Sequence, residues 1–440
     1  MQRTAQLGFG LLVLIYLGLG ILYATRTPAW QSPDEPAHYN YVRQLADGQF
    51  PLMEAGDYDQ EYQSTVISSR FDPQYSIESF EYEDYQPPLY YLLLTPSYWL
   101  GNGSITALRL TSVLIGLGIV TLAFLTAQNV FPDKPWVALT VAAFVALLPQ
   151  HLSLLSSVNN DALAELLIAT MLYVITRPLG KSPASDSHIN TRQLAFLLGL
   201  AFLTKVTAYL MAGAIGLYLL WRYWGDWRQL WQQGVRLFVP ALLIGLIWWG
   251  RNVIVYPGPD FLGTVAHDAV VVGQPTTGEW VAQFGTPEVL RRFFRTSFQS
   301  FYGQFGWMCC PLPSWGYFPL RIMTILGIAG AVGWLWRFRP KSTRQQHLLI
   351  IFGSLLGLNL LLYLAYNLRF VQHQGRYLFA SLVPIGVAMA AGLNLWLTPL
   401  TQRTRYAGFA LPLTITLGFT FLNLYTIFFI LPCGLAFGGC

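Results

Sequence analysis

Long apolar segments separated by short polar loops run along most of the 440-residue chain. An α-helix needs about 20 apolar residues to cross a bilayer, and ten runs reach or approach that length. The run 194–224 is too long for one helix and divides near Lys205, so the pattern predicts about eleven membrane-spanning helices. The ten runs lie near 6–25, 105–129, 136–154, 162–179, 194–224, 234–250, 315–337, 348–366, 376–398 and 408–432.

The composition agrees with this pattern. Hydrophobic residues make up 54% of the chain and charged residues only 11%, whereas soluble domains carry about 25% charged residues. We therefore expect an all-α polytopic membrane protein, with residues 1–440 forming one integral membrane domain. The first run could be a cleaved signal peptide, but its apolar stretch from Gly8 to Ala24 is long enough to span. The basic residues cluster beside apolar segments, which argues against nucleic-acid binding.

The positions of Lys and Arg predict the orientation, because short cytosolic loops carry an excess of basic residues. A cytosolic N-terminus places twelve basic residues in cytosolic loops, with only Asp133, Asp186 and Asp226 as acids beside them. We therefore expect a protein of the cell (inner) membrane, with its C-terminus and two large loops, 26–104 and 251–314, outside the cytosol. The twelve are Lys134, Arg177, Lys181, Arg192, Arg222, Arg228, Arg337, Arg339, Lys341, Arg344, Arg403 and Arg405.

The first large loop, 26–104, holds twelve of the 21 acidic residues. Within it the segment from Pro88 to Leu100 is apolar but too short to cross the membrane core at about 1.5 Å per residue. We expect an interfacial or re-entrant helix there. Counting this segment as a span would invert every later helix and break the charge rule.

Four cysteines all fall on the predicted outer side, where disulfides persist. They are Cys309, Cys310, Cys433 and Cys440. A bridge between the first pair and the second is therefore expected, whereas adjacent Cys309 and Cys310 are not expected to pair with each other. Their spacing matches no zinc pattern.

The segment Ser32–His38 directly follows the first predicted span. Ser32 and Glu35 have the spacing of a capping box, and Pro33 suits the first position of a helix. Asp34 is left without a structural role, in a first turn whose dipole favours an ionised carboxylate. Such a carboxylate could act as a general base, with His38 on the same face one turn on. We favour function for Asp34 and capping for Glu35.

The segment Glu81–Tyr91 places acids before a short apolar helix. Glu83 and Asp84 could bind a divalent cation, since carboxylates are the ligands that such ions prefer. The alternative is a solvated acidic rim ahead of a Pro-Pro helix start. This segment alone does not decide between the two.

Two further motifs lie at the outer ends of predicted helices. Asp161 follows Asn160, and it could simply cap the next helix. Glu165, one turn further on, is an intramembrane carboxylate that is costly unless it has a partner. Lys205 interrupts the long apolar run; it is either a lysine that snorkels to the interface or a fixed cation that faces a phosphate.

The segment Gln372–Tyr377 brings Arg376 to the outer side, against the charge rule. Arginine suits phosphate oxygens because it donates two parallel hydrogen bonds. All five motifs fall on the outer side, and they combine carboxylates with isolated cations. These are the side chains needed to transfer a chemical group from a lipid-phosphate donor at the membrane surface.

At these residues the chain resembles the membrane glycosyltransferases of the GT-C fold. The resemblance is to the branch that contains the protein O-mannosyltransferases and the aminoarabinose transferase of lipid A, and to bacterial multi-pass proteins without an assigned function. It covers most of the chain. The matching stretches, in order, are Ser32–His38, Tyr85–Tyr91, Val158–Leu163, Gly199–Thr207 and Gln374–Tyr377.

The resemblance implies an enzyme that uses a sugar on a polyprenyl phosphate outside the cytosol. The first-loop acid of the family corresponds to Asp34, with Glu35 as the neighbouring alternative, and the second-loop acid corresponds to Asp161. The Pro-containing helix start corresponds to Gln86 and the two prolines after it. Where relatives often carry His or Glu before that segment, this chain has Asp84 and Tyr85, which leaves a metal there open.

The resulting hypothesis is a hexosyl- or pentosyltransferase that moves a sugar from a polyprenyl-phosphate donor to a hydroxyl of a lipid, glycan or protein acceptor. The rivals are a carrier or flippase for lipid-linked sugars and a non-catalytic protein of envelope assembly. The expected residues are Asp34, Glu35 and Asp161 in catalysis; Lys205, Arg376, Tyr377 and Gln374 at the donor phosphate; His38, Gln86, Tyr90 and Asn160 at the substrate; and Glu83 and Asp84 at a divalent metal.

Overall fold

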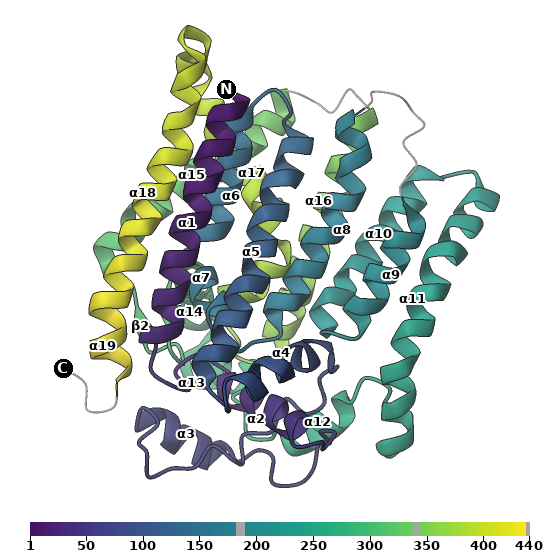
Figure 1. The fold of residues 1–440 in the computed structure, drawn as a ribbon, viewed down its shortest axis with the longest axis vertical. Helices are drawn as coiled ribbons and strands as arrows, with labels where there is room; N and C mark the ends of the chain where they lie inside the picture. The colour runs from purple at the N-terminus through teal and green to yellow at the C-terminus, as the bar shows by residue number, and fades with distance from the viewer. Residues whose placement is uncertain (182–189, 338–342, 437–440) are drawn as a thin grey trace.

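The computed structural model describes residues 1–181, 190–337 and 343–436. Long helices form an elongated bundle, and a layer of short helices covers the end opposite the N-terminus (Figure 1). The long elements are α1 (Gln2–Arg26), α5 (Ile105–Val130), α6 (Pro135–Leu147), α8 (Asp161–Lys181), α9 (Thr191–Phe202), α10 (Leu210–Arg222), α11 (Trp227–Val255), α15 (Ser314–Arg337), α16 (Thr343–Arg369), α17 (Leu382–Arg403) and α18 (Ala410–Tyr425).

Within the described residues, seven helices are long and apolar enough to cross a membrane. An eighth span results if α6 and α7 (Pro149–Leu155), which meet at 61°, are counted as one broken helix. The expected break near Lys205 is present, because α9 ends at Phe202 and a short 3₁₀ helix, η1 (Val206–Tyr209), precedes α10. The predicted all-α membrane fold is confirmed, while the number of about eleven spans stays a prediction.

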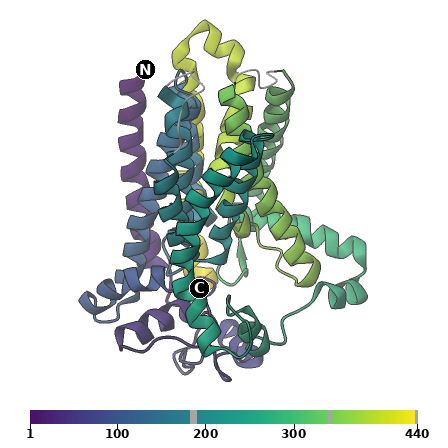
Figure 2. The same cartoon turned by 90° about the vertical axis from the view of Figure 1, so that its right-hand side faces the viewer.

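The covering layer consists of short elements from two parts of the chain. In Figure 1 the predicted interfacial helix, α4, lies across the end of the bundle and does not run along it, while Figure 2 shows α13 and α14 projecting to one side. The elements are α2 (Glu35–Ala46), α3 (Gln60–Ser68), α4 (Leu89–Leu100), α12 (Thr264–Val270), α13 (Thr277–Phe284), α14 (Thr286–Tyr302) and the antiparallel pair β1 (Gln304–Phe305) and β2 (Cys310–Pro311).

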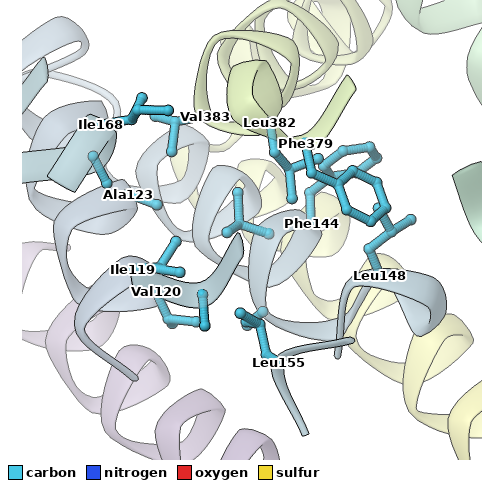
Figure 3. Close-up of a cluster of buried hydrophobic side chains, with 14 of the residues drawn as sticks. Ile119, Val120, Ala123, Phe144, Leu148, Leu155, Ile168, Phe379, Leu382 and Val383 are labelled. Atoms are coloured by element: carbon cyan, nitrogen blue, oxygen red, sulfur yellow. The ribbon is translucent and has the colours of Figure 1, made fainter. Parts of the chain in front are cut away.

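The hydrophobic core lies between helices of the bundle, and Figure 3 shows part of it. Ile119 of α5, Phe144 of α6 and Ile168 of α8 are buried there. Phe379 packs into the same cluster from a 3₁₀ helix, η2 (Gly375–Ser381), that precedes α17. This buried ring anchors η2 to the bundle and thereby fixes the position of Arg376, three residues earlier.

The remaining described elements follow α17. They are η3 (Arg405–Phe409), the π-helical turn η4 (Thr426–Ile430) and α19 (Leu431–Leu435). The expected disulfide between the two cysteine pairs is wrong, because Cys309 and Cys310 are free thiols whereas Cys433 is disulfide-bonded. Cys310 is held in the β1–β2 pair, and Cys440 lies outside the described residues.

Candidate active site

Asp34 lies at the N-terminus of α2 in the left-handed conformation, with φ of 67°. Its side chain does not cap the helix. One carboxylate oxygen, Oδ2, accepts a hydrogen bond from Nη2 of Arg376 at 2.8 Å, and Oδ1 accepts one from the Tyr82 hydroxyl at 3.2 Å. A non-glycine residue in this conformation costs roughly 1–3 kcal/mol and persists only where the surroundings enforce it. The backbone here turns the carboxylate toward Arg376.

A second ion pair joins the bundle at the same end. Nζ of Lys205 lies 2.7 Å from Oδ1 of Asp161, and the two side chains keep 17% and 28% of their surface exposed. Asp161 begins α8, but the side chain that caps its backbone N–H is that of Asn159, at 2.9 Å. The capping alternative for Asp161 is therefore not needed, and its carboxylate is available to Lys205.

The two ion pairs and their neighbours form one electrostatic cluster. Burial acts to raise the pKa of Asp34, but Arg376, His38 and Lys205 outweigh it and lower that pKa below its ordinary value. Burial and then Lys205 lower the pKa of His38 to about 3. At neutral pH the Asp34 carboxylate is therefore ionised and the His38 imidazole is neutral.

Glu83 belongs to this cluster, but in the opposite protonation state. Burial and the nearby charge of Asp34 raise the pKa of Glu83 to about 8. Its Oε2 atom is buried without a hydrogen-bond partner. Near neutral pH this carboxyl group therefore carries a proton and can donate a hydrogen bond.

Aromatic residues of α4 support the cluster from the other side. The Tyr91 hydroxyl lies 2.9 Å from Nδ1 of His38 and accepts a hydrogen bond from the Asn160 side chain at 3.1 Å. The Tyr90 hydroxyl accepts the backbone N–H of Asn159 at 2.9 Å. The structure thus brings His38 and Asn160 together, whereas fully buried Tyr90 holds the turn before Asp161 in place.

Gln86 and Asn160 each keep an unused polar atom. The Gln86 side chain donates to the Tyr85 hydroxyl at 2.9 Å, while its Oε1 is buried without a partner. Oδ1 of Asn160 is also buried and unpaired. Both oxygens therefore keep an unused capacity to accept hydrogen bonds.

Gln374 positions Arg376. Its Oε1 accepts a hydrogen bond from Nε of Arg376 at 2.7 Å, and its amide donates to Gln372 at 2.8 Å. The Tyr377 hydroxyl donates to the same Gln372 side chain at 3.4 Å. All three predicted residues of this motif, Gln374, Arg376 and Tyr377, are therefore joined through hydrogen bonds around Gln372.

Glu35 has a different role from the one expected. It is fully buried, and Arg109 of α5 donates two hydrogen bonds to its carboxylate, at 2.8 and 2.6 Å. The predicted capping box is wrong, because α2 begins at Glu35 itself and Ser32 and Pro33 precede the helix. A buried arginine requires a counter-charge, and this ion pair takes the Glu35 side chain away from the helix terminus.

Arg109 clamps three parts of the chain together. Besides Glu35, its guanidinium donates to the carbonyl groups of Ala24, Thr27 and Pro28. Sequence reasoning missed this residue, although a charged residue within the predicted span 105–129 was a signal. It also missed His151, whose Nε2 lies 2.8 Å from Oε2 of Glu165 and provides the partner that this intramembrane carboxylate needs.

The predicted metal ligands Glu83 and Asp84 have different surroundings. Glu83 interacts with Asp34 and Lys205, whereas Oδ2 of Asp84 accepts a hydrogen bond from Gln44 at 2.8 Å. Among the residues that the structure describes, no group of three His, Cys, Asp or Glu side chains is arranged to hold a metal ion. These side chains do not fit a metal site built by the protein alone, and we derive no step through a metal.

Comparison with known proteins adds independent support for the fold. Residues 85–249 match the family model for dolichyl-phosphate-mannose-protein mannosyltransferase. This segment includes Asp161 and Lys205 but neither Asp34 nor Arg376. No curated protein matches the chain.

Solved structures match over nearly the whole chain. ArnT from Cupriavidus metallidurans bound to undecaprenyl phosphate has a TM-score of 0.57 at 15% identity, over 95% of this chain and 76% of ArnT. AglB, the oligosaccharyltransferase of Archaeoglobus fulgidus, in complex with an inhibitory peptide and a dolichol-phosphate, has a TM-score of 0.57 at 14% identity, over 97% of this chain. The chain spans 56% of the length of AglB.

These matches confirm the resemblance that the five motifs indicated. The family model covers residues 85–249, and the solved structures cover 95% and 97% of the chain. The chain is a multi-pass membrane protein whose fold is similar to that of ArnT and AglB, the GT-C fold that the motifs led us to expect, and its residues 85–249 match the protein mannosyltransferase family model.

Proposed function

We propose that this protein is a glycosyltransferase that moves a sugar from a polyprenyl-phosphate donor to a hydroxyl group of a lipid, glycan or protein acceptor. The reaction takes place outside the cytosol, at the end of the bundle that carries the short helices. ArnT and AglB support the donor class, since their structures hold undecaprenyl phosphate and dolichol-phosphate, respectively.

One observation carries this proposal: the two ion pairs, Asp34–Arg376 and Asp161–Lys205, lie in one cluster. The four residues come from separate parts of the sequence, and each pKa in the cluster responds to several of the others. The cluster provides an ionised carboxylate, a protonated carboxyl group and two fixed cations. A transfer away from phosphate requires a base for the acceptor and positive charge for the leaving group.

Asp34 acts as the general base. Its carboxylate removes the proton from the acceptor hydroxyl as the oxygen attacks the anomeric carbon of the sugar. A new carbon–oxygen bond forms, the bond between the anomeric carbon and the phosphate oxygen breaks, and its electron pair leaves with the polyprenyl phosphate. Positioning of the acceptor against the donor supplies part of the rate.

Lys205 and Arg376 hold the departing phosphate. Each cation is paired with a carboxylate, so the phosphate takes over part of that pairing when the donor binds. Arg376 can use both terminal nitrogens on two phosphate oxygens, and Gln374 keeps its Nε oriented. Asp161 holds Lys205 in position and pairs with its positive charge between turnovers.

The test is direct. Purified full-length protein is incubated with radiolabelled polyprenyl-phosphate hexoses and pentoses and with lipid, glycan and peptide acceptors. The proposal predicts acceptor-dependent release of free polyprenyl phosphate and labelling of the acceptor. Movement of intact donor between vesicle leaflets, without sugar transfer, would instead establish a carrier.

A further inference from the structure

A cavity of about 620 Å³ lies between the C-terminal half of α2 and the loop segments 49–57 and 78–84. This volume is within the range of sites that bind small molecules, roughly 300–1,000 Å³. The two ion pairs of the candidate site do not line it. Six carboxyl groups line it: Asp47, Glu54, Asp57, Glu78, Glu81 and Asp84.

The negative charge of this cavity is poorly compensated. Among the described residues that line it, Arg43 is the one cation, and it reaches Glu81 only at 3.5 Å. Burial raises the pKa of Asp57 to about 6 and the pKa values of Glu81 and Asp84 above their ordinary range. A cationic ligand would remove the cost of ionising these groups.

Asp84 provides an independent indication of a ligand. Its side chain is 1% exposed and lines the cavity. Oδ2 is satisfied by Gln44, but Oδ1 has no hydrogen-bond partner. Burial keeps this carboxyl group protonated on its own, and an ammonium group that reached Oδ1 would supply the positive charge that allows it to ionise.

The other lining residues indicate what surrounds that ammonium group. The amide side chains of Gln44 and Gln49 can both donate and accept hydrogen bonds, which suits hydroxyl groups. The ring of Phe50 is 51% exposed at the cavity wall and offers an apolar face. Polar groups beside an exposed ring fit a compact compound with hydroxyl groups, such as an amino sugar.

A single turn of the chain connects this cavity with Asp34. The backbone N–H of Asp84 bonds to the carbonyl of Glu81 at 3.0 Å. Within that turn Tyr82 donates to Asp34, while Glu81 and Asp84 line the cavity. A molecule bound in the cavity is therefore held by the same turn that positions the general base.

We propose that this cavity binds the acceptor through a positively charged amino group, in a compound that also carries hydroxyl groups. The inference rests on the proposed function, because it assigns the acceptor of that reaction. It adds that the acceptor, or the part of it next to the reacting hydroxyl, is cationic.

The experiment measures binding without donor, by titration calorimetry on the full-length protein in detergent. The two probes are the β-1,4-linked glucosamine disaccharide and its N,N′-diacetyl derivative, which has the same rings but no positive charge. We expect the amine to bind at least about tenfold more tightly, as the loss of a charge-assisted hydrogen bond implies. Asp84→Asn retains an acceptor for Gln44 and should weaken amine binding about tenfold.

Glu61→Gln is the matched control, since Glu61 is an exposed acid of α3 outside the cavity. It should leave amine binding unchanged. If Asp84→Asn does not fold, Asp57→Asn serves in its place. Equal binding of the two disaccharides, unchanged binding in the cavity variant, or displacement of the amine by stoichiometric CaCl₂ would each overturn the proposal. Because the assay contains no donor, failure of sugar transfer does not affect its outcome.

Discussion

Asp34 and Glu35 are neighbours in sequence but have opposite environments. Asp34 keeps a quarter of its side chain exposed and pairs with Arg376 beside open surface. Glu35 is fully buried and is held by Arg109 and the backbone N–H of Val158. The Asp34 carboxylate can contact a substrate, whereas the Glu35 carboxylate can only stabilise the fold.

Asp34→Asn should therefore remove the chemistry and disturb the fold less than Glu35→Gln does, because Asp34 keeps a quarter of its side chain exposed and Asp161 also interacts with Arg376. The amide has nearly the same volume. Its oxygen can still accept from Arg376 while its NH2 group donates to the Tyr82 hydroxyl, but it cannot take up the acceptor proton. Loss of a positioned general base costs about a hundred- to ten-thousand-fold in rate. The measurement is kcat for polyprenyl phosphate release, with Glu61→Gln as the control and the thermal midpoint as a check of folding. Wild-type kcat in Asp34→Asn would refute the role of this residue.

Glu35→Gln should act on stability. It leaves the Arg109 guanidinium buried without a counter-charge, and breaking a buried ion pair in this way costs about 3–5 kcal/mol. We expect reduced abundance in the membrane and a lower thermal midpoint in detergent. A variant with normal abundance and midpoint but no activity would place Glu35 in the reaction instead.

Glu83 makes the stability of the folded protein depend on pH. This contribution can be separated from those of the neighbouring groups. Its pKa is about 8 in the folded protein and 4.5 ordinarily, because burial and Asp34 disfavour its charge. As the pH rises between these values, the unfolded chain loses a proton that the folded protein retains. The stability from this group is thus present below about pH 4.5 and lost as the pH approaches about 8.

Glu83→Gln should flatten that dependence. The fall in thermal midpoint between about pH 5 and pH 8 should be smaller in the variant than in the wild type. Comparing the two proteins cancels the opposite contribution of His38, whose pKa is lowered. If the thermal midpoint depended on pH equally in the two proteins, the pKa of Glu83 would not be raised in the folded protein.

At the scale of the element, η2 is fixed by close packing against α14. The backbone N–H of Gly375 donates to the Ser300 hydroxyl at 2.7 Å. A Cβ atom on Gly375 would meet the Ser297 carbonyl and would lie 2.6 Å from the backbone nitrogen of Phe301. The helix that carries Arg376 can therefore approach α14 only with glycine at this position.

Gly375→Ala should displace η2 and weaken the Arg376–Asp34 pair. Overpacking of this kind costs about 1–3 kcal/mol, and activity should fall together with the thermal midpoint. Gly357→Ala in α16 is the matched control, since a Cβ there meets nothing within 4 Å. It should be neutral or raise stability by about 0.5–1 kcal/mol. Equal effects of the two substitutions would exclude the packing argument.

Helices were predictable from sequence, but the contacts between them were not. Apolar length is a local property, so the break at Lys205 and the short helix after Pro88 follow from the pattern. The motifs around Asp34, Asp161 and Arg376 were predicted from short polar stretches at the ends of apolar runs, which are also a local property. The capping box failed because Arg109, 74 positions away, competes for Glu35. No local signal identifies which carboxylate pairs with which cation, and Tyr82 was missed for that reason.

At the scale of the whole molecule, the candidate site lies at the end of the bundle opposite the N-terminus (Figure 1). The distribution of basic residues predicts that this end faces away from the cytosol. A membrane-impermeant thiol reagent should therefore label Glu61→Cys and Glu279→Cys in intact cells but not Arg403→Cys. The background is Cys309→Ser with Cys310→Ser, because these thiols are free. Labelling of Arg403→Cys alone would show that the predicted orientation is reversed.

The Asp34–Arg376 pair joins residues 342 positions apart, and this separation determines when the site can exist. During synthesis Asp34 leaves the ribosome long before Arg376 is made, and domains assemble as their segments emerge. Through all of that interval Asp34 lacks Arg376, its partner in the complete fold. The first loop therefore gains this partner only after α16 has entered the bundle and η2 has docked, so that a chain that stops short of η2 lacks the pair even where the earlier helices have assembled.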